Sequence, residues 1–228
     1  EEANVWQILF YRSLALTPLL IIVVTCQNRW DAWGALHRTG WAGIIGGIAL
    51  VVAFSGGIYS IQHTTVANAM FLFAAAPFAT AILGKIILKE SVRRGTLFCI
   101  IFAVAGIAIM VWEGIQIGHL AGNLAALMSA LGFAAFTVAL RWRRVKDTLP
   151  TVFLAGSFSM IFAVAVCFIQ GNDLTIPIND IFVSVAMGFL QVGAGLIFYT
   201  IGARKVPAAE LALLSMTEVV FGPIWTWL

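Results

Sequence analysis

Three ionisable side chains lie inside long apolar runs of the sequence, namely Arg12, Glu210 and Glu218. A charged side chain is costly in a lipid bilayer, so an ionisable residue within such a run indicates a functional site unless a structural role explains it. Glu218 is nearest the middle of its run and should be protonated or paired. It could bind an ammonium group, carry a proton, or form only a structural hydrogen bond between helices. Arg12 is expected to snorkel or to pair structurally, and Glu210 to be hydrated near the end of its run.

Uncharged polar residues add to this set. Gln191 is central in its run and Asn68 lies one turn into another, where either could hydrogen-bond a zwitterionic solute or a neighbouring helix. Pro77 lies in the same run as Asn68. Because proline leaves one carbonyl without its helical partner, it could bend that helix and open a cavity.

Nothing in the sequence indicates catalysis or a bound cofactor. The glycines are scattered and form no phosphate-binding loop, and no nucleophile is paired with a base. The histidines fall in different loops and the cysteines are far apart, which argues against a metal site. These residues are His37, His63, His119, Cys26, Cys99 and Cys167. We therefore expect no enzyme activity, no metal and no cofactor.

The elements that must position these residues are the apolar runs themselves. Of the 228 residues, 61% are apolar and 10% are charged, which is more apolar surface than a soluble domain can bury. The runs are continuous and about 20 residues long, the length of a helix that crosses a bilayer. We predict an all-α polytopic membrane protein with eight spans, near 5–26, 40–62, 66–88, 95–112, 120–142, 149–170, 180–203 and 207–228.

Lysine and arginine gather on one side of the predicted spans. They occur in alternate loops, which the positive-inside rule assigns to the cytoplasm. These residues are Arg29, Arg38, Lys85, Lys89, Arg93, Arg94, Arg141, Arg143, Arg144, Lys146, Arg204 and Lys205. The other loops carry only acidic charges and should face the periplasm or exterior. Membrane topology thus accounts for the net charge of +3, and no nucleic-acid partner is expected.

A weak internal repeat relates the two halves of the chain. Residues 64–69, TTVANA, open the third run and align with residues 206–211, VPAAEL, which open the eighth, a shift of 142 positions. Only the loop before the second segment contains lysine and arginine, so the two copies must be inverted. The shift spans five runs, which implies ten helices with both ends of the complete protein in the cytoplasm. We predict repeats at 1–112, lacking its first helix, and at 113–228, lacking its last helix.

Three segments resemble a known family of membrane proteins. They are Phe10-Tyr11-Arg12-Ser13-Leu14-Ala15, the stretch from Thr64 to Pro77, and the stretch from Val206 to Glu218, which looks like the second motif again. With the inverted topology they resemble the EamA-type, ten-helix members of the drug/metabolite transporter superfamily. The likeness is greatest to YddG-type exporters of aromatic and other amino acids and of methyl viologen. Many members have Glu-Pro where this chain has Glu218-Val219, which is a departure from the family pattern.

The resemblance implies a secondary transporter that exports small organic solutes, above all amino acids including aromatic ones, across the bacterial inner membrane by alternating access. Organic cations or drugs are the alternative cargo, and a channel or scaffold is the alternative class. Arg12 is the one basic side chain inside a predicted span, which disfavours phosphate-bearing solutes because these need several basic groups. The pathway should lie between the repeats near mid-membrane, lined by the second, third, fifth, seventh and eighth runs.

The family also implies which aromatic residues border the cavity. Their rings could stack on flat or cationic solutes, although each ring taken singly is more often a packing residue. With the polar residues above, the expected substrate-binding residues are Tyr59, Asn68, Phe71, Phe133, Gln191, Tyr199, Glu218 and Trp225. Expected points of flexure between the two halves are Gly56, Gly57, Gly193 and Gly195. The expected partners are a small-molecule substrate and the lipid bilayer.

Overall fold

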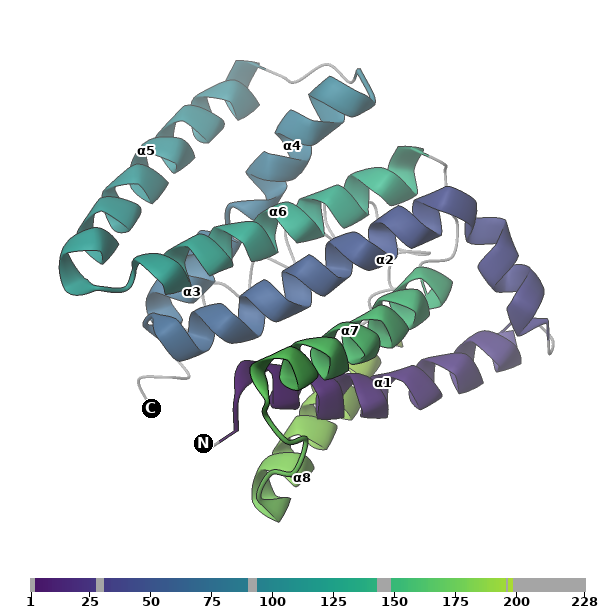
Figure 1. Cartoon of the computed structure of the whole chain (residues 1–228). Helices are drawn as coiled ribbons and strands as arrows, with labels where there is room; N and C mark the ends of the chain where they lie inside the picture. The colour runs from purple at the N-terminus through teal and green to yellow at the C-terminus, as the bar shows by residue number, and fades with distance from the viewer. Residues whose placement is uncertain (1–2, 28–30, 90–93, 143–148, 196, 199–228) are drawn as a thin grey trace.

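The computed structural model describes residues 3–27, 31–89, 94–142, 149–195 and 197–198. Within these ranges every regular element is helical, which confirms the all-α prediction (Figure 1). The elements are α1 (Val5–Gln27), α2 (Ala32–His63), α3 (Val66–Phe73), α4 (Ala76–Ile87), α5 (Arg94–Ile117), α6 (Leu120–Trp142), α7 (Leu149–Gln170), α8 (Ile178–Ala186) and the π-helix η1 (Met187–Ala194).

Seven of the eight predicted runs coincide with these helices. Five helical segments are long and apolar enough to cross a bilayer: Val5–Gln27, Trp33–His63, Val66–Ile87, Leu120–Trp142 and Leu149–Gln170. Two shorter apolar helical stretches, Ile100–Ile109 within α5 and Ile178–Ala194 over α8 and η1, fall in the fourth and seventh runs. The eighth run, 207–228, lies outside the described residues. The chain is therefore a polytopic membrane protein.

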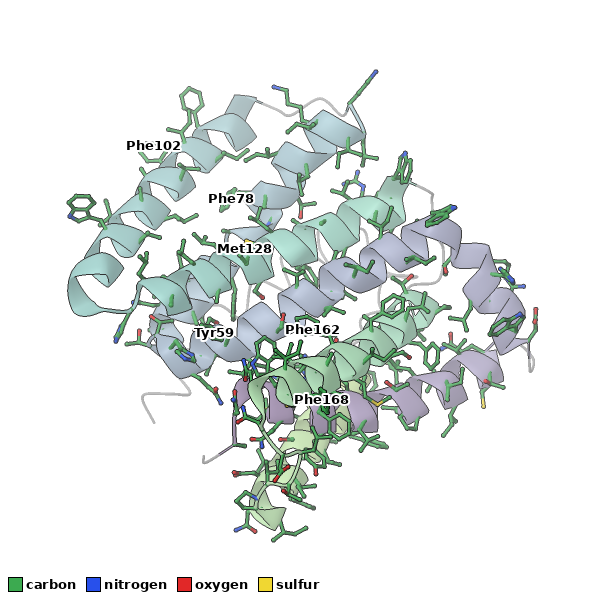
Figure 2. The ribbon with its side chains drawn as sticks, viewed as in Figure 1. Tyr59, Phe78, Phe102, Met128, Phe162 and Phe168 are labelled. Atoms are coloured by element: carbon green, nitrogen blue, oxygen red, sulfur yellow. The ribbon has the colours of Figure 1, made fainter. Side chains whose placement is uncertain are left out.

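Large apolar side chains on the outside of the bundle agree with this conclusion. Phe102 on α5 is 75% exposed and Phe168 on α7 is 87% exposed, and both are labelled in Figure 2. In water such surfaces would drive aggregation, whereas lipid tails solvate them at no cost. These positions are the ones we expect to contact lipid.

Helix α2 begins earlier than the sequence indicates. α2 starts at Ala32, where the carboxylate of Asp31 accepts hydrogen bonds from the Gly34 amide (2.8 Å) and from Arg38 Nη1 (3.1 Å). These partners, the amide first, hold the pKa of Asp31 below its ordinary value. Gly40 then breaks the helix at φ 52°, a conformation that favours glycine. Arg38, expected in a loop, is thus on the short helical segment of α2 that precedes the break at Gly40.

The third run is interrupted where proline requires it. α3 ends at Phe73 and α4 begins at Ala76, with Pro77 in its first turn. Pro77 has no amide hydrogen, so the Phe73 carbonyl has no helical donor four residues later. The residues between the two helices still donate backbone hydrogen bonds to the end of α3, from Ala74 N to Met70 O at 3.2 Å and from Ala75 N to Leu72 O at 3.1 Å. The helix is therefore interrupted at Pro77, as the sequence indicates, while the opening of a cavity there stays a prediction.

The centre of the bundle is the antiparallel pair formed by α2 and α6, which lie side by side in Figure 1. Small residues bring the two backbones together, since a Cβ on Gly132 would lie 2.6 Å from the Ala49 carbonyl oxygen. A Cβ on Gly56 would lie 2.7 Å from the Ala125 carbonyl oxygen. Gly56, expected to be a point of flexure, is therefore held in a close helix contact.

Contacts among the described helices give the two halves opposite orientations. The shift of 142 positions carries α1 onto α7, and α2 onto α8 with η1. Trp6, early in α1, packs edge-on against Phe162 of α7 with ring centroids 5.6 Å apart, whereas Thr17, later in α1, lies beside Gly156, earlier in α7, so these helices are antiparallel. The end of α2 and the start of α8 line one cavity, at the end of the bundle where α1 begins. The described part of the chain has the geometry of an inverted repeat.

Candidate functional site

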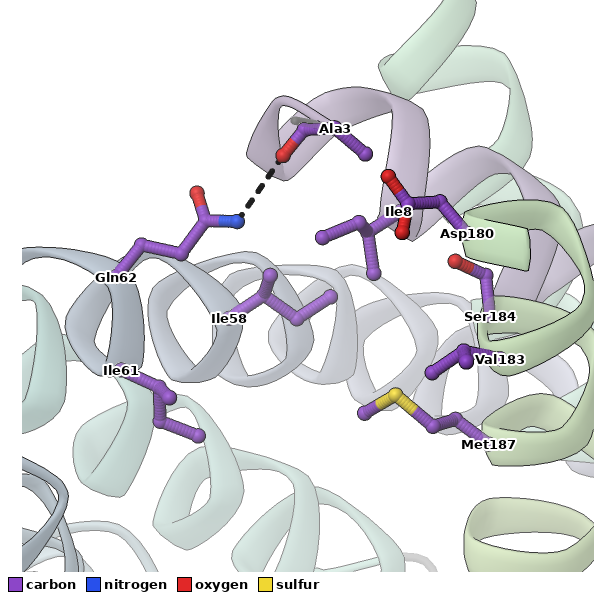
Figure 3. Close-up of a pocket in the computed structure, with 9 residues that line it drawn as sticks. All are labelled: Ala3, Ile8, Ile58, Ile61, Gln62, Asp180, Val183, Ser184 and Met187. Atoms are coloured by element: carbon purple, nitrogen blue, oxygen red, sulfur yellow. Dashed lines mark hydrogen bonds between the residues drawn. The ribbon is translucent and has the colours of Figure 1, made fainter. Parts of the chain in front are cut away.

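A cavity of about 140 Å³ lies where α1, α2 and α8 meet, at the end of the bundle where α1 begins and α2 ends (Figure 3). We call it the outer cavity. Most of its wall is apolar, and three residues add polar groups: Gln62, Asp180 and Ser184. Its lining residues are Ala3, Ile8, Ile58, Ile61, Gln62, Asp180, Val183, Ser184 and Met187. The cavity therefore joins two helices of the first half of the chain to one of the second.

Local capping places the acidic group of the outer cavity. The Pro177 carbonyl starts α8 by accepting hydrogen bonds from the amides of Asp180 (3.0 Å) and Ile181 (3.1 Å). Asp180 consequently lies in the first turn, where the helix dipole favours a negative charge. Across the cavity, the Gln62 amide donates to the Ala3 carbonyl at 3.3 Å, shown dashed in Figure 3. One carboxylate thus borders a cavity whose wall is mostly apolar.

Two further bonds hold α1 against the segment that precedes α8. Gln7 Nε2 donates to the Asp173 carbonyl at 2.6 Å, and the Tyr11 hydroxyl donates to the Leu174 carbonyl at 3.0 Å. The first and second halves of the chain are therefore joined by hydrogen bonds at this end, next to the cavity.

Arg12 lies one helical turn inward from the outer cavity. Its side chain is only 7% exposed, and Cζ lies 4.6 Å from the centroid of the Phe54 ring. Nε and Nη2 are buried and have no hydrogen-bond partner among the described residues. The backbone of α8 and η1 comes close, since a Cβ on Gly188 would overlap the Arg12 carbonyl oxygen. Of the two expectations for Arg12, snorkelling is wrong, because tight packing of α1, α2 and η1 keeps the side chain inside, and structural pairing is represented among the described residues by the contact with the Phe54 ring.

Tyr59 lines a second, shallower cavity between α1, α2 and α6. This cavity has a volume of about 210 Å³ and is lined by Trp6, Val52, Ser55, Gly56, Tyr59, Ala125 and Met128. The Tyr59 ring stacks on the His63 ring, with centroids 3.9 Å apart, and the Tyr59 carbonyl accepts a hydrogen bond from His63 Nδ1 (2.9 Å). Figure 2 labels Tyr59 on α2 and Met128 on α6. Tyr59 therefore borders an open cavity to which Trp6 contributes a second aromatic ring.

The other predicted substrate residues do not join Tyr59 in either cavity. Asn68 is half-buried in the first turn of α3, Phe71 is 53% exposed, Phe133 is 44% exposed, and Gln191 is exposed on η1. Their expected roles stay predictions. The remaining candidates lie outside the described residues, namely Tyr199, Glu210, Glu218 and Trp225.

Sequence reasoning missed the polar residues of the outer cavity. Residue 180 is the first residue of the predicted seventh run, at its boundary with an exterior loop, whereas the structure starts the helix at Pro177 and brings the Asp180 carboxylate onto the cavity wall. Gln62 and Ser184 are ordinary in type and spacing, so no local signal marks them. A search for acidic residues within three positions after a proline at a predicted span end would have found Asp180.

Comparison with known proteins agrees with this architecture. The model of the EamA-like transporter family matches residues 1–112 and again residues 120–228, so the internal repeat is shown. An uncharacterized transporter of Helicobacter pylori is 23% identical over 221 residues, covering 93% of this chain and 73% of the relative. A biotin transporter of Escherichia coli is 23% identical over 197 residues, covering 82% of this chain and 64% of the relative.

A mammalian protein is similar as well. Solute carrier family 35 member G1 of Mus musculus is 24% identical over 200 residues, covering 80% of this chain and 52% of the relative. No solved structure matches the chain. The two family matches together cover nearly the whole sequence and coincide with the two halves that the helix contacts relate. The chain is a membrane transporter, and it belongs to the EamA-like transporter family.

Proposed function

We propose that the protein is a secondary transporter of a small organic solute, with amino acids, including aromatic ones, as its first candidate cargo. The observation that carries this proposal is the outer cavity, which lies between α1 and α2 of one half and α8 of the other. Carriers built from inverted repeats bind solutes at the repeat interface, and rocking of the halves exposes that interface to each side in turn. An apolar wall with a few polar groups suits a compact apolar solute.

The relatives widen the range of candidate cargo. One of them is named a biotin transporter, so biotin is a second probe. Organic cations remain the alternative cargo, and Asp180 is the observation that favours them, because none of the described residues that line the outer cavity is basic. Methyl viologen is the matching probe.

Topology and pathway are part of the same proposal. We place the protein in the bacterial inner membrane, with the outer cavity facing the periplasm because no lysine or arginine occupies that end of the chain's spans. The two repeats extend over 1–112 and 113–228. Tyr59 borders the pathway through the second cavity, and Glu218 supplies an acid near mid-membrane. Export is the proposed direction.

The test is transport by the full-length protein in proteoliposomes. Counterflow of labelled phenylalanine, tryptophan, biotin and methyl viologen should exceed that of empty liposomes for at least one probe. Ile61→Trp, which fills the outer cavity, should abolish most of this flux. Ile86→Trp is the matched control, because Ile86 is 67% exposed on α4 and lines neither cavity.

Two results would contradict the proposal. Flux equal to that of empty liposomes for every probe would exclude transport of these classes. Unchanged flux in Ile61→Trp would show that the pathway does not pass through the outer cavity.

A further inference from the structure

We propose that Arg12 is the binding site for a carboxylate group of the transported solute. This inference rests on the proposed transport function and adds the chemical group that the protein recognises. Three observations carry this proposal. The Arg12 guanidinium has a free edge, the described helices around it offer no acidic partner, and the group lies one turn below the outer cavity.

The two unpartnered nitrogens of Arg12 form one edge of the guanidinium. Nε–H and one N–H of Nη2 point the same way and form a fork that matches the two oxygens of a carboxylate. The face of the same group is already covered by Phe54, at 4.6 Å from the ring centroid. The cation–π contact therefore fixes the plane of the guanidinium and leaves its carboxylate-binding edge free.

No acidic side chain on the described helices around Arg12 neutralises its charge. The sequences of α1, α2, α7 and η1 contain neither aspartate nor glutamate. The one acid on α8 is Asp180, eight residues and about two turns before Gly188, which contacts the Arg12 backbone. A buried charge without an acceptor is strongly unfavourable, so an anionic group from outside these helices completes the site. Glu210 and Glu218 lie outside the described residues, and the preference for acids over amides measured below separates a solute carboxylate from either of them.

The outer cavity is the route by which a solute reaches the Arg12 guanidinium. On α1 the step from Ile8 to Arg12 is four residues, and on α2 the step from Ile58 to Phe54 is the same. Arg12 and Phe54 therefore each lie one helical turn inward from a residue of the cavity wall, on the same face of their helix as that residue. Hence a solute in the cavity has its inner end next to the Arg12–Phe54 pair.

The size of the cavity limits what lies above the carboxylate. A volume of about 140 Å³ is close to the ~150 Å³ of an apolar cavity that holds one benzene ring. The recognised solute therefore has a compact apolar or aromatic body with a carboxylate at one end. Nε and Nη2 of Arg12 are buried in this conformation, so rocking of the half that contains α8 must open the one turn of helix between the outer cavity and Arg12.

The experiment compares matched acids and amides by isothermal titration of the full-length protein in nanodiscs. The probes are benzoate with benzamide and phenylacetate with phenylacetamide. Wild type should bind each acid on the order of tenfold more tightly than its amide, as expected when a charge-assisted fork is lost. Arg12→Gln should abolish that preference, and Arg12→Lys, which keeps the charge but loses the fork, should weaken acid binding about tenfold.

Two further variants separate recognition from folding. Phe54→Leu should weaken acid binding while leaving the amides unchanged, because it removes the ring that orients the guanidinium. Arg38→Gln is the matched control, since that arginine is exposed and pairs with Asp31 at the far end of the bundle. If Arg12→Gln does not fold, Arg12→Lys and Phe54→Leu carry the test.

Equal binding of acids and amides by wild type, no binding of either, or an unchanged acid preference in Arg12→Lys and Phe54→Leu would overturn the proposal. Its failure is distinct from failure of the transport function. If a probe is transported but acids bind no better than amides, the carboxylate site is excluded and the transport function stands. If acids are preferred in an Arg12-dependent way but no probe is transported, the transport function is excluded and the carboxylate site stands.

Discussion

Two adjacent glycines on α2 give opposite predictions for the same substitution. In Gly56→Ala the new Cβ would lie 2.7 Å from the Ala125 carbonyl oxygen and 3.2 Å from the Ser129 amide nitrogen. Both atoms belong to the backbone of α6, so the helices must move apart by about half an ångström to restore normal contact. In Gly57→Ala the nearest atom is Ser129 Oγ at 3.5 Å, an ordinary contact.

The magnitudes follow from these distances. Overpacking costs about 1–3 kcal/mol, and separating α2 from α6 also weakens the 2.7 Å hydrogen bond from Ser129 Oγ to the Ala53 carbonyl, worth about 0.6 kcal/mol in membranes. The higher helix propensity of alanine offsets at most ~1 kcal/mol of this loss of stability. We expect Gly56→Ala to lower the melting temperature by roughly 5 °C and Gly57→Ala to leave it unchanged or raise it slightly.

The assay is thermal unfolding of each variant in the same detergent, together with proteoliposome flux. A melting temperature of Gly56→Ala at or above that of wild type would refute the close contact of α2 with α6. Loss of flux in both variants without loss of stability would instead support flexure at this pair, as expected from the sequence.

Three other outcomes follow from the described contacts. Because the pKa of Asp31 is lowered in the folded protein, its capping contribution is complete above the ordinary value of 3.8 and is lost as the pH falls through the lowered value. Amide hydrogen exchange at the start of α2 should therefore speed up below that pH in wild type and become pH-independent in Asp31→Asn, after correction for intrinsic rates. Thr64→Val removes the 2.7 Å hydrogen bond to the buried amide oxygen of Asn123 and should cost about 1 kcal/mol of unfolding free energy, whereas Thr64→Ser should retain it; equal loss in both would exclude the bond. In a background without native cysteines, Ile61→Cys should react with an impermeant maleimide from the periplasm and Asp31→Cys only after the membrane is opened; the reverse pattern would invert the proposed orientation.

The positions of the helices follow from the sequence because they depend on local chain properties. An apolar run of about 20 residues needs no partner to be helical in lipid, since all its backbone hydrogen bonds close within the run. Run lengths alone therefore located α1, α6 and α7 to within a residue or two of their ends. The break before Pro77 was equally local, because it follows from one missing amide hydrogen.

The boundaries of α2 were harder because two signals conflicted. The hydropathy run begins near residue 40, but Asp31 caps a helix nine residues earlier and Gly40 breaks it. The capping carboxylate and the glycine are each common in loops, so their combined effect depends on the geometry of the folded chain.

The candidate site depended on contacts between distant segments. Tyr59 was anticipated at a cavity, whereas Asp180 and Gln62 lie 118 positions apart in the chain and line the same cavity only because the end of α2 and the start of α8 lie at one end of the bundle. For Arg12 the sequence identified a charge within a span, which is a matter of composition. Its burial over Phe54 with a free hydrogen-bonding edge was decided by tertiary packing, because whether a long side chain reaches the membrane surface depends on what the neighbouring helices leave open.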